Sequence, residues 1–320
     1  MSWDVILPFL KPIEGLIGDP DITDIMVAGG GPVFIEKSGV MEEVPGVSVP
    51  EKPLQFALRN IARALDADIN EENPLLDSRL PDGSRVAAVF APCSVNGTVL
   101  TIRKFNSHLY TAEELVRLGS LPAELLDTLR AAVEARQNIL ISGGTGSGKT
   151  TLLTALTAFI PAAERLVTIE DTCEIQINRR NIVRLEARRE QPGLCAVSIR
   201  DLLRTTLRLR PDRILLGEVR SGEAFDLLQA LNTGHAGTLS TIHANSAELA
   251  LSRFTTCVLL SGIELPYRAI RSNIADALNL VIHVGRPKGL RVVTEALRLT
   301  RYEAGDDRFQ LETLYERKQP

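Results

Sequence analysis

The stretch Gly143-Gly144-Thr145-Gly146-Ser147-Gly148-Lys149-Thr150 determines how the middle of this sequence folds. It follows an apolar run, Asn138–Ile141, and precedes a helical pattern, Lys149–Phe159. Glycine adopts positive φ without steric cost, so the stretch can turn tightly between a strand and a helix. A buried-type strand bounded by glycines and followed by a helix predicts a parallel α/β sheet.

The same stretch fits the phosphate-binding pattern G-x4-G-K-[ST] in the strand–loop–helix context that this pattern requires. Backbone N–H groups of such a loop surround phosphate oxygens, and the helix N-terminus adds a favourable dipole. We expect Lys149 to contact the β- and γ-phosphates of ATP and the Thr150 hydroxyl to bind Mg²⁺. The predicted nucleotide-binding residues are Gly143, Gly144, Thr145, Gly146, Ser147, Gly148, Lys149, Thr150 and Thr151. The alternative is a glycine-rich turn without a ligand, in which Lys-Thr at the helix start has no packing role.

Alternating strands and helices continue after the glycine-rich stretch, so residues 137–320 are predicted to form a largely parallel α/β domain. Further strands are expected at Arg165–Glu170, Arg213–Leu216 and Gly237–His243, with helices at 198–208, 222–231 and 246–261. The sequence returns to strand-like runs from Leu278 onward.

Residues 1–105 have a different pattern, that of a smaller α+β domain. Strands are expected at Thr23–Gly29, Pro32–Gly39, 84–92 and 97–105, with a helix at Leu54–Leu65. The glycines at 29–31 suit a hairpin turn between the first two strands. Residues 106–136 are expected to form a helical linker, whose first helix begins with the capping signature Thr111 and Glu114.

Carboxylates follow two of the predicted strands. Glu218 ends the strand that begins at Arg213, and Glu170 and Asp171 end another. In α/β sheets the carboxyl ends of strands face the ligand crevice, so Glu218 and Glu170 are expected to approach the γ-phosphate. The alternative is that each caps a helix or pairs with an arginine.

Histidine and arginine side chains add two further candidates. His243 ends a strand, where it can sense a γ-phosphate or hold a water; a lone histidine is more often a structural residue. Arg200, Arg204 and Arg208 recur every four residues and share one helix face. That face is either a solvated stripe or a contact with a neighbouring subunit.

The composition of the chain excludes several classes of protein. Its 320 residues, 44% hydrophobic and 24% charged, are typical of a folded protein and exclude disulfide miniproteins, collagen-like repeats and disordered chains. A formal charge of −4 argues against a dedicated nucleic-acid binder. Cys93, Cys173, Cys195 and Cys257 have no metal-ligand spacing. No secretory signal or membrane span is expected, so membrane contact would be peripheral or made through a partner.

Four blocks in order resemble the ATPase superfamily of type II and type IV secretion, pilus retraction and conjugation. They are the P-loop GGTGSGKT, the acidic box TIEDTCEI, the Walker B segment DRILLGEVRSGEA and the histidine box GHAGTLSTIHANS, which span residues 143–246. The segments RLPDGSRVAAVFAP and GTVLTIRKF also resemble the first domain of this family. The resemblance implies a RecA-like P-loop domain and a smaller, PAS-like α+β N-terminal domain.

The resemblance also assigns roles at matching positions. Glu170 matches the glutamate that activates water, Glu218 the Walker B glutamate that holds the metal, and His243 a residue near the nucleotide. Asp171 is placed with Thr150 and Glu218 as a metal-binding residue. Further matches are the first-domain arginines that reach the phosphates, Arg85 and Arg103, and an arginine at the subunit seam, Arg220.

Two departures favour the conjugative branch, the TrbB-like and VirB-eleven-like ATPases. Arg210-Pro211-Asp212 stands where pilus-retraction members tend to have Asp-Pro-Asp, and no cysteine-rich insertion is present. The resemblance therefore implies a cytoplasmic hexameric ATPase that associates peripherally with the inner membrane and serves its secretion or conjugation machinery. No sequence-specific nucleic-acid binding is expected. The alternatives are a type II secretion or pilus motor, a DNA-translocating motor, a small-molecule kinase and a regulatory module without turnover.

Overall fold

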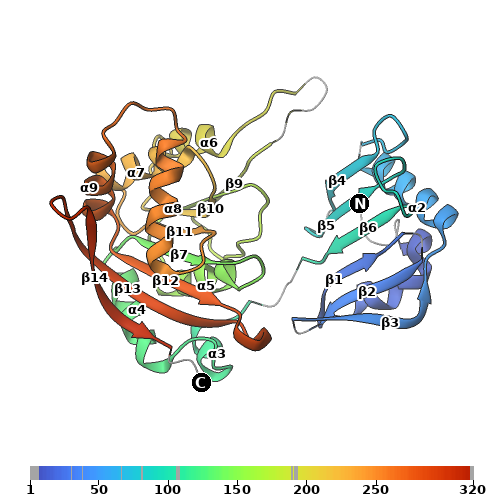
Figure 1. Cartoon of the computed structure of the whole chain (residues 1–320), viewed down its shortest axis with the longest axis horizontal. Helices are drawn as coiled ribbons and strands as arrows, with labels where there is room; N and C mark the ends of the chain where they lie inside the picture. Colours follow the sequence, from blue (N-terminus) through green and yellow to red (C-terminus); the bar gives the residue numbers. More distant parts are fainter. Residues whose placement is uncertain are drawn as a thin grey trace. The chain divides into compact units, whose positions relative to one another are not determined.

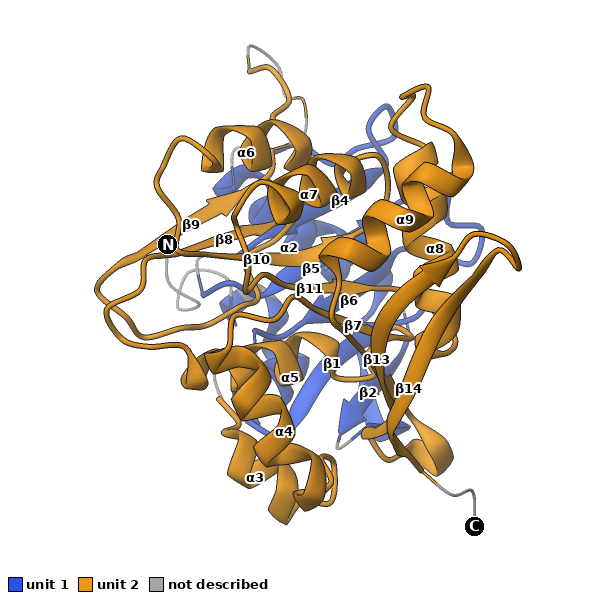
Figure 2. Cartoon of the chain, turned by 90° about the vertical axis from the view of Figure 1, so that its left-hand side faces the viewer, with its two compact units in different colours: residues 1–108 blue, residues 109–320 orange. Residues whose placement is uncertain are grey.

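The computed structural model describes residues 7–29, 31–37, 39–65, 67–80, 82–105, 109–188, 190 and 194–317. The chain divides into two compact units, residues 1–108 and 109–320, shown in blue and orange in Figure 2. The architecture is mixed α/β with two sheets, and each unit is built around one of them.

The smaller unit contains a six-stranded antiparallel sheet in the order β3-β2-β1-β6-β5-β4. Its elements are η2 (Leu7–Ile13), α1 (Glu14–Gly18), β1 (Ile22–Val27), β2 (Pro32–Lys37), β3 (Val40–Ser48), α2 (Glu51–Ala64), β4 (Leu75–Arg79), β5 (Arg85–Val89) and β6 (Val99–Arg103). Val86 and Ala88 of β5 are buried in one core with Leu58 of α2. Since strand side chains alternate between faces, Arg85 and Arg103 lie on the face opposite this core.

The strands predicted around the glycine run are confirmed. They are β1 and β2, which pair antiparallel with Val27 opposite Val33. Gly29 has a φ of +56°, the left-handed conformation that the turn requires. Gly30 of the predicted turn and residues 106–108 of the predicted linker lie outside the described residues.

The larger unit contains an eight-stranded sheet in the order β14-β13-β12-β7-β11-β10-β8-β9. Its strands are β7 (Ile139–Gly143), β8 (Leu166–Glu170), β9 (Ile182–Glu186), β10 (Arg213–Val219), β11 (Leu239–Ile242), β12 (Leu280–Gly285), β13 (Val292–Glu303) and β14 (Arg308–Glu316). The six strands from β12 to β9 run parallel, and β13 and β14 add an antiparallel edge.

Helices cover both faces of this sheet (Figure 1). They are α3 (Ala112–Arg117), α4 (Ala123–Glu134), α5 (Lys149–Leu156), α6 (Ile199–Thr206), α7 (Glu223–Asn232), α8 (Ala247–Leu259) and α9 (Tyr267–Ala277), with the 3-10 turns η3 (Thr157–Phe159) and η4 (Pro287–Gly289). Leu140 of β7 packs in one core with α6 to α9, whereas its neighbours Ile139 and Ile141 pack in a second core with α3, α4 and α5. Central strands buried on both faces explain the apolar runs in the sequence.

The two helices between 109 and 136 belong to the larger unit. Leu115 of α3 and Leu129 of α4 are buried in the same core as α5. The predicted capping box is confirmed, because the Thr111 hydroxyl accepts from Glu114 N and the Glu114 carboxylate accepts from Thr111 N. Among the helices of the described residues, none has both the length and the apolar character needed to cross a membrane.

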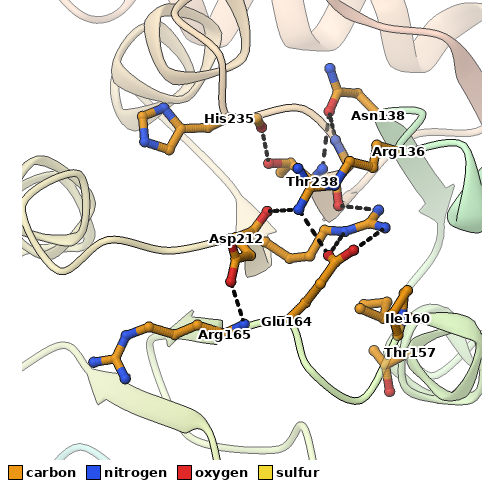
Figure 3. A network of polar contacts seen from close by, with 12 residues as sticks. Arg136, Asn138, Thr157, Ile160, Glu164, Arg165, Asp212, His235 and Thr238 are labelled. Carbon is orange, nitrogen blue, oxygen red and sulfur yellow. Dashed lines mark hydrogen bonds and ion pairs between the residues drawn. The ribbon is translucent and has the colours of Figure 1, made fainter.

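A buried arginine lies at the amino-terminal edge of the larger sheet, where β10 begins. The Arg213 side chain is 1% exposed and its Nε donates to Glu164 Oε2 at 2.5 Å. Figure 3 shows Glu164 shared with Arg136, whose NH2 lies 3.1 Å from Oε2. A Cβ at Gly237, which has a φ of +86°, would lie 2.2 Å from Arg213 NH1. The position before β11 therefore requires glycine to accommodate the guanidinium.

Two arginines of the predicted helical stripe join α6 to α7. Arg200 Nε and Arg204 Nε contact the two oxygens of Asp226 at 2.6 and 2.7 Å. Both guanidinium groups therefore have a partner within the chain, while Arg208 lies beyond the end of α6.

We predict that Glu164→Ala destabilises the larger unit by about 3 kcal/mol, because it leaves the Arg213 charge buried without its partner. Glu312→Ala, which removes the exposed pair with Arg298, should cost below about 1 kcal/mol. Urea denaturation of both variants provides the test. An equal decrease in the free energy of unfolding in the two variants would contradict the predicted role of Glu164 as the partner of a buried charge.

The Glu164 contribution should depend on pH. Burial alone would raise the pKa of Glu164, but hydrogen bonds from Arg213 and Arg136 outweigh burial and hold the pKa below its ordinary 4.5. The stabilisation is therefore present above the ordinary pKa and is lost as the pH falls through the lowered one. The difference in free energy of unfolding between wild type and Glu164→Ala should therefore become smaller in acid.

Candidate active site

The glycine-rich loop lies between β7 and α5, and its conformation requires glycine at several positions. Gly148 is the N-cap of α5 with a φ of +101°, and Gly146 has a φ of +67°. A Cβ at Gly143 would lie 2.3 Å from the backbone oxygen of Val284 at the end of β12. The adjacent strand therefore packs so closely that only glycine fits at the start of the loop.

Lys149 extends from the first turn of α5 back into this loop. Its Nζ donates to the carbonyl oxygens of Gly143 and Gly144 at 3.0 and 2.9 Å. Burial lowers the pKa of Lys149. Ser147 Oγ is buried without a hydrogen-bond partner among the described residues. A buried ammonium and an unpartnered hydroxyl in one loop fit an anionic ligand.

The other predicted loop residues surround this centre. Thr150 and Thr151 are half-buried in the first turn of α5, and the exposed loop residues are Gly144, Thr145 and Gly146. The loop therefore has an open side, and the hydroxyls of the first helical turn lie next to the buried lysine in the chain.

Three predicted site residues meet at the carboxyl ends of β7, β10 and β11. His243 Nδ1 lies 3.5 Å from Lys149 Nζ, and His243 Nε2 lies 3.3 Å from Glu218 Oε1. Burial, and next the positive charge of Lys149, lower the pKa of His243. A neutral imidazole therefore bridges the loop lysine and the glutamate at the end of β10.

Arg220 extends this set of contacts to the end of β8. Its Nε lies 3.0 Å from Glu218 Oε1, its NH2 donates to Glu218 Oε2 at 3.1 Å, and its NH1 donates to Asp171. The Glu218 hydrogen bond raises the pKa of Arg220. Lys149, His243, Glu218, Arg220 and Asp171 thus form one continuous run of polar contacts, which we call the site network.

Glu170 lies beside the site network at the end of β8, next to β10 in the sheet. It is 3% exposed, and its Oε1 accepts from Glu174 N and Ile175 N at 2.9 and 3.0 Å. Oε2 is buried and has no hydrogen-bond partner in the part of the chain that the structure describes. Burial raises the pKa of Glu170 to about 7, although the two N–H bonds oppose this shift. The carboxylate is held at one oxygen and available at the other.

The donor set at this edge fits a magnesium ion that arrives with a nucleotide. Among the described residues, no three or more His, Cys, Asp or Glu side chains are grouped to hold a metal alone. Mg²⁺ is usually held by one or two protein oxygens together with substrate phosphates and waters. The Thr150 hydroxyl and the Glu218 and Asp171 carboxylates are such oxygen donors.

Arg85 and Arg103 lie in the smaller unit, on adjacent strands. Arg85 pairs in register with Arg103 of β6 on one side and with Arg79 of β4 on the other. Asp24 continues the row on β1, and Arg103 Nε contacts it at 3.0 Å. Like charges directly opposite one another are unfavourable in antiparallel sheets, so this row of arginines suits an anion.

Sequence reasoning missed two residues that position the site. A Cβ at Gly217 would lie 2.8 Å from Glu170 Cγ, so the backbone of β10 makes room for the Glu170 side chain. His283 of β12 is buried beside the loop strand, with its Nδ1 2.9 Å from Ser142 Oγ. Gly217 precedes the predicted Glu218, but its function depends on β8 lying alongside, which the local sequence does not reveal.

Known proteins resemble this chain over most of its length. The profile of the family described as Type II/IV secretion system protein matches residues 9–290. The conjugal transfer protein TrbB of Rhizobium radiobacter is 35% identical over 289 residues, 89% of this chain and 86% of that protein. The type IV secretion system protein PtlH of Bordetella pertussis is 37% identical over 305 residues, 88% of this chain and 90% of that protein.

A solved structure supports the same fold. The ATPase DotB of Yersinia pseudotuberculosis aligns with a TM-score of 0.65 over 91% of this chain and 78% of that one, at 17% sequence identity. At this identity the likeness concerns the fold alone.

We predict that Gly217→Ala lowers ATP hydrolysis about a hundredfold, because the added methyl group displaces Glu170 and misplacement of a reacting group by about 1 Å has an effect of this size. Binding of ADP should change little, since β11 lies between β10 and β7, the strand that leads into the glycine-rich loop. Gly305→Ala is the control, because a Cβ there meets nothing within 4 Å. Unchanged hydrolysis in Gly217→Ala would contradict the positioning role.

Proposed function

We propose that the chain, which belongs to the type II/IV secretion system protein family, hydrolyses ATP to power type IV secretion or conjugative transfer. The larger unit is then a RecA-like P-loop domain and the smaller one a PAS-like domain. The observation that carries the proposal is the site network, which joins the loop lysine to the carboxylates at the ends of β10 and β8.

In this proposal the larger unit binds the nucleotide through its glycine-rich loop. Backbone N–H groups of the loop and the N-terminus of α5 surround the phosphates. Lys149 Nζ exchanges its contacts with the carbonyls of Gly143 and Gly144 for phosphate oxygens. The Thr150 hydroxyl and the Glu218 and Asp171 carboxylates would hold Mg²⁺. When bound, the ion neutralises charge that develops on the phosphates.

Glu170 is the residue that we assign to the attacking water. Water attacks the γ-phosphorus, the bond to the β–γ bridging oxygen breaks, and the proton of the water passes to a base. The Glu170 carboxylate has one oxygen fixed by two N–H groups and the other buried without a partner among the described residues. With its pKa raised to about 7, it is a stronger base than an ordinary carboxylate.

The remaining roles concern the γ-phosphate and the assembly. His243 lies between Lys149 and Glu218, where a neutral imidazole can respond to the presence of the γ-phosphate. Arg85 and Arg103 are proposed as phosphate-contacting residues of the family's first domain, and Arg220 as a residue of the subunit seam. We propose a homohexamer in the cytoplasm that associates peripherally with the inner membrane and its secretion machinery.

We predict that wild type releases phosphate from Mg-ATP. In Lys149→Ala this rate should fall about a hundredfold, because the positive charge next to the transferring phosphoryl group is removed. Size-exclusion chromatography with light scattering, with and without Mg-ATP, tests the ring. A six-subunit peak supports the proposal. A protein that stays monomeric with nucleotide at high concentration would contradict the hexamer.

We predict that Glu218→Gln keeps nucleotide binding and loses turnover, because the amide retains the shape of the side chain but not its charge. Glu312→Gln, an exposed carboxylate on β14, should change neither. Binding is measured with ADP by calorimetry and turnover by phosphate release. Full turnover in Glu218→Gln would exclude Glu218 from the catalytic machinery.

A further inference from the structure

The guanidinium of Arg220 uses all three of its nitrogens on two carboxylates. Nε and NH2 face the two oxygens of Glu218 at 3.0 and 3.1 Å, and NH1 donates to Asp171. This fork-to-fork geometry is the strongest form of ion pair that arginine makes with a carboxylate. The two carboxylates are the ones that the proposed function assigns to the divalent cation.

Within the site network the positive and negative side-chain charges are equal in number, and Glu174 adds a further negative charge near Lys149 and Arg220. Lys149 and Arg220 supply two positive charges, and Glu218 and Asp171 supply two negative ones. His243 occupies the side of Glu218 that faces Lys149, because its Nε2 lies 3.3 Å from Oε1. A divalent cation at Glu218 would meet the positive charge of the guanidinium, and both carboxylate oxygens already accept contacts from Arg220.

The guanidinium can leave this position without disturbing the fold. The backbone N–H groups of Arg220 and Ser221 both donate to Glu223 Oε1 at the start of α7, which fixes the main chain. The Arg220 side chain itself is 57% exposed. Rotation about side-chain bonds therefore carries the guanidinium into solvent while β10 and α7 stay in place.

From this geometry we infer that Arg220 is the resident counter-ion of the nucleotide-free site, bound to Glu218 and Asp171 where the divalent cation later binds. Its guanidinium leaves Glu218 when Mg²⁺ arrives with the nucleotide, and returns when the ion departs. The inference rests on the proposed function, since it identifies Glu218 as the metal-holding carboxylate. It adds that the free chain protects this carboxylate from divalent cations in the absence of nucleotide.

The test is Mn²⁺ binding to the nucleotide-free protein, measured from the loss of the free Mn²⁺ signal in electron paramagnetic resonance. Arg220→Gln should bind Mn²⁺ about tenfold more tightly than wild type, because one positive charge next to the ion is removed. Arg220→Lys keeps the charge without the fork and should lie between the two. Adding Glu218→Gln to Arg220→Gln should return the affinity to that of wild type.

Arg204→Gln is the matched control. Arg204 is also 57% exposed and also pairs with a carboxylate of the larger unit, Asp226. The Arg204→Gln variant should bind Mn²⁺ with the affinity of wild type. This result would distinguish competition between Arg220 and the ion from the effect of a general change in net charge. Equal Mn²⁺ affinity in wild type, Arg220→Gln and Arg220→Lys would overturn the inference. So would a gain in Arg204→Gln as large as that in Arg220→Gln.

Metal-free ADP binding by wild type, measured by calorimetry in the presence of a chelator, distinguishes a failure of the counter-ion role from a failure of the proposed function. If ADP binds but Arg220→Gln shows no gain in Mn²⁺ affinity, the counter-ion role fails, whereas the nucleotide binding on which the proposed function depends stands. If wild type binds neither ADP nor ATP, the proposed function fails, and the inference fails with it.

Discussion

A charged group inside the larger sheet constrains the rest of that unit. The Arg213 guanidinium is buried at the amino-terminal edge, and a buried charge is costly unless it is paired and hydrogen-bonded. Its partners come from separate segments, since Glu164 precedes β8 and the carbonyl of Gly237 precedes β11. Asn138, which precedes β7, accepts a hydrogen bond from Gly237 N at 2.8 Å. This contact links β7, as a third strand, to the segment that holds Arg213. A shift of one residue in any of these strands would break the contacts, so the register of the sheet is fixed at this edge.

The site lies at the opposite edge of the same strands. His235 and His243 of the histidine box illustrate this, because they lie on either side of β11 (Leu239–Ile242). Before β11, the His235 carbonyl accepts a hydrogen bond from the Thr238 hydroxyl, whereas after β11 the His243 ring contacts Lys149 and Glu218. With the strands fixed in register at one edge, their carboxyl ends place the side chains of the candidate site at defined positions at the other. The spacing of the active-site residues thus follows from contacts that never touch the ligand.

The sequence was informative wherever the chemistry is local. The glycine-rich turn, the capping box at Thr111 and the strand-end positions of Glu170, Glu218 and His243 can all be predicted, because each depends on neighbours within a few residues. The burial of Arg213 could not be predicted, since an arginine at the start of a strand is normally exposed. The need for glycine at 217 depends in the same way on the neighbouring strand β8 and its Glu170. Such contacts join residues that lie far apart in the chain, and a single sequence does not show which of these residues are close in space.

Both edges contain an ion pair of arginine with glutamate, and the two pairs differ in burial, which supports the different roles that we propose for them. The Arg213 side chain is 1% exposed, so breaking its ion pair with Glu164 would leave a buried charge without a partner. The pair is therefore a fixed part of the fold. Arg220 is 57% exposed, so its guanidinium regains water when it leaves Glu218. Only the exposed pair can exchange its cation for another at small cost. The proposed function depends on that property, because a carboxylate assigned to a metal ion has to bind and release it in every cycle while the sheet beneath it stays unchanged.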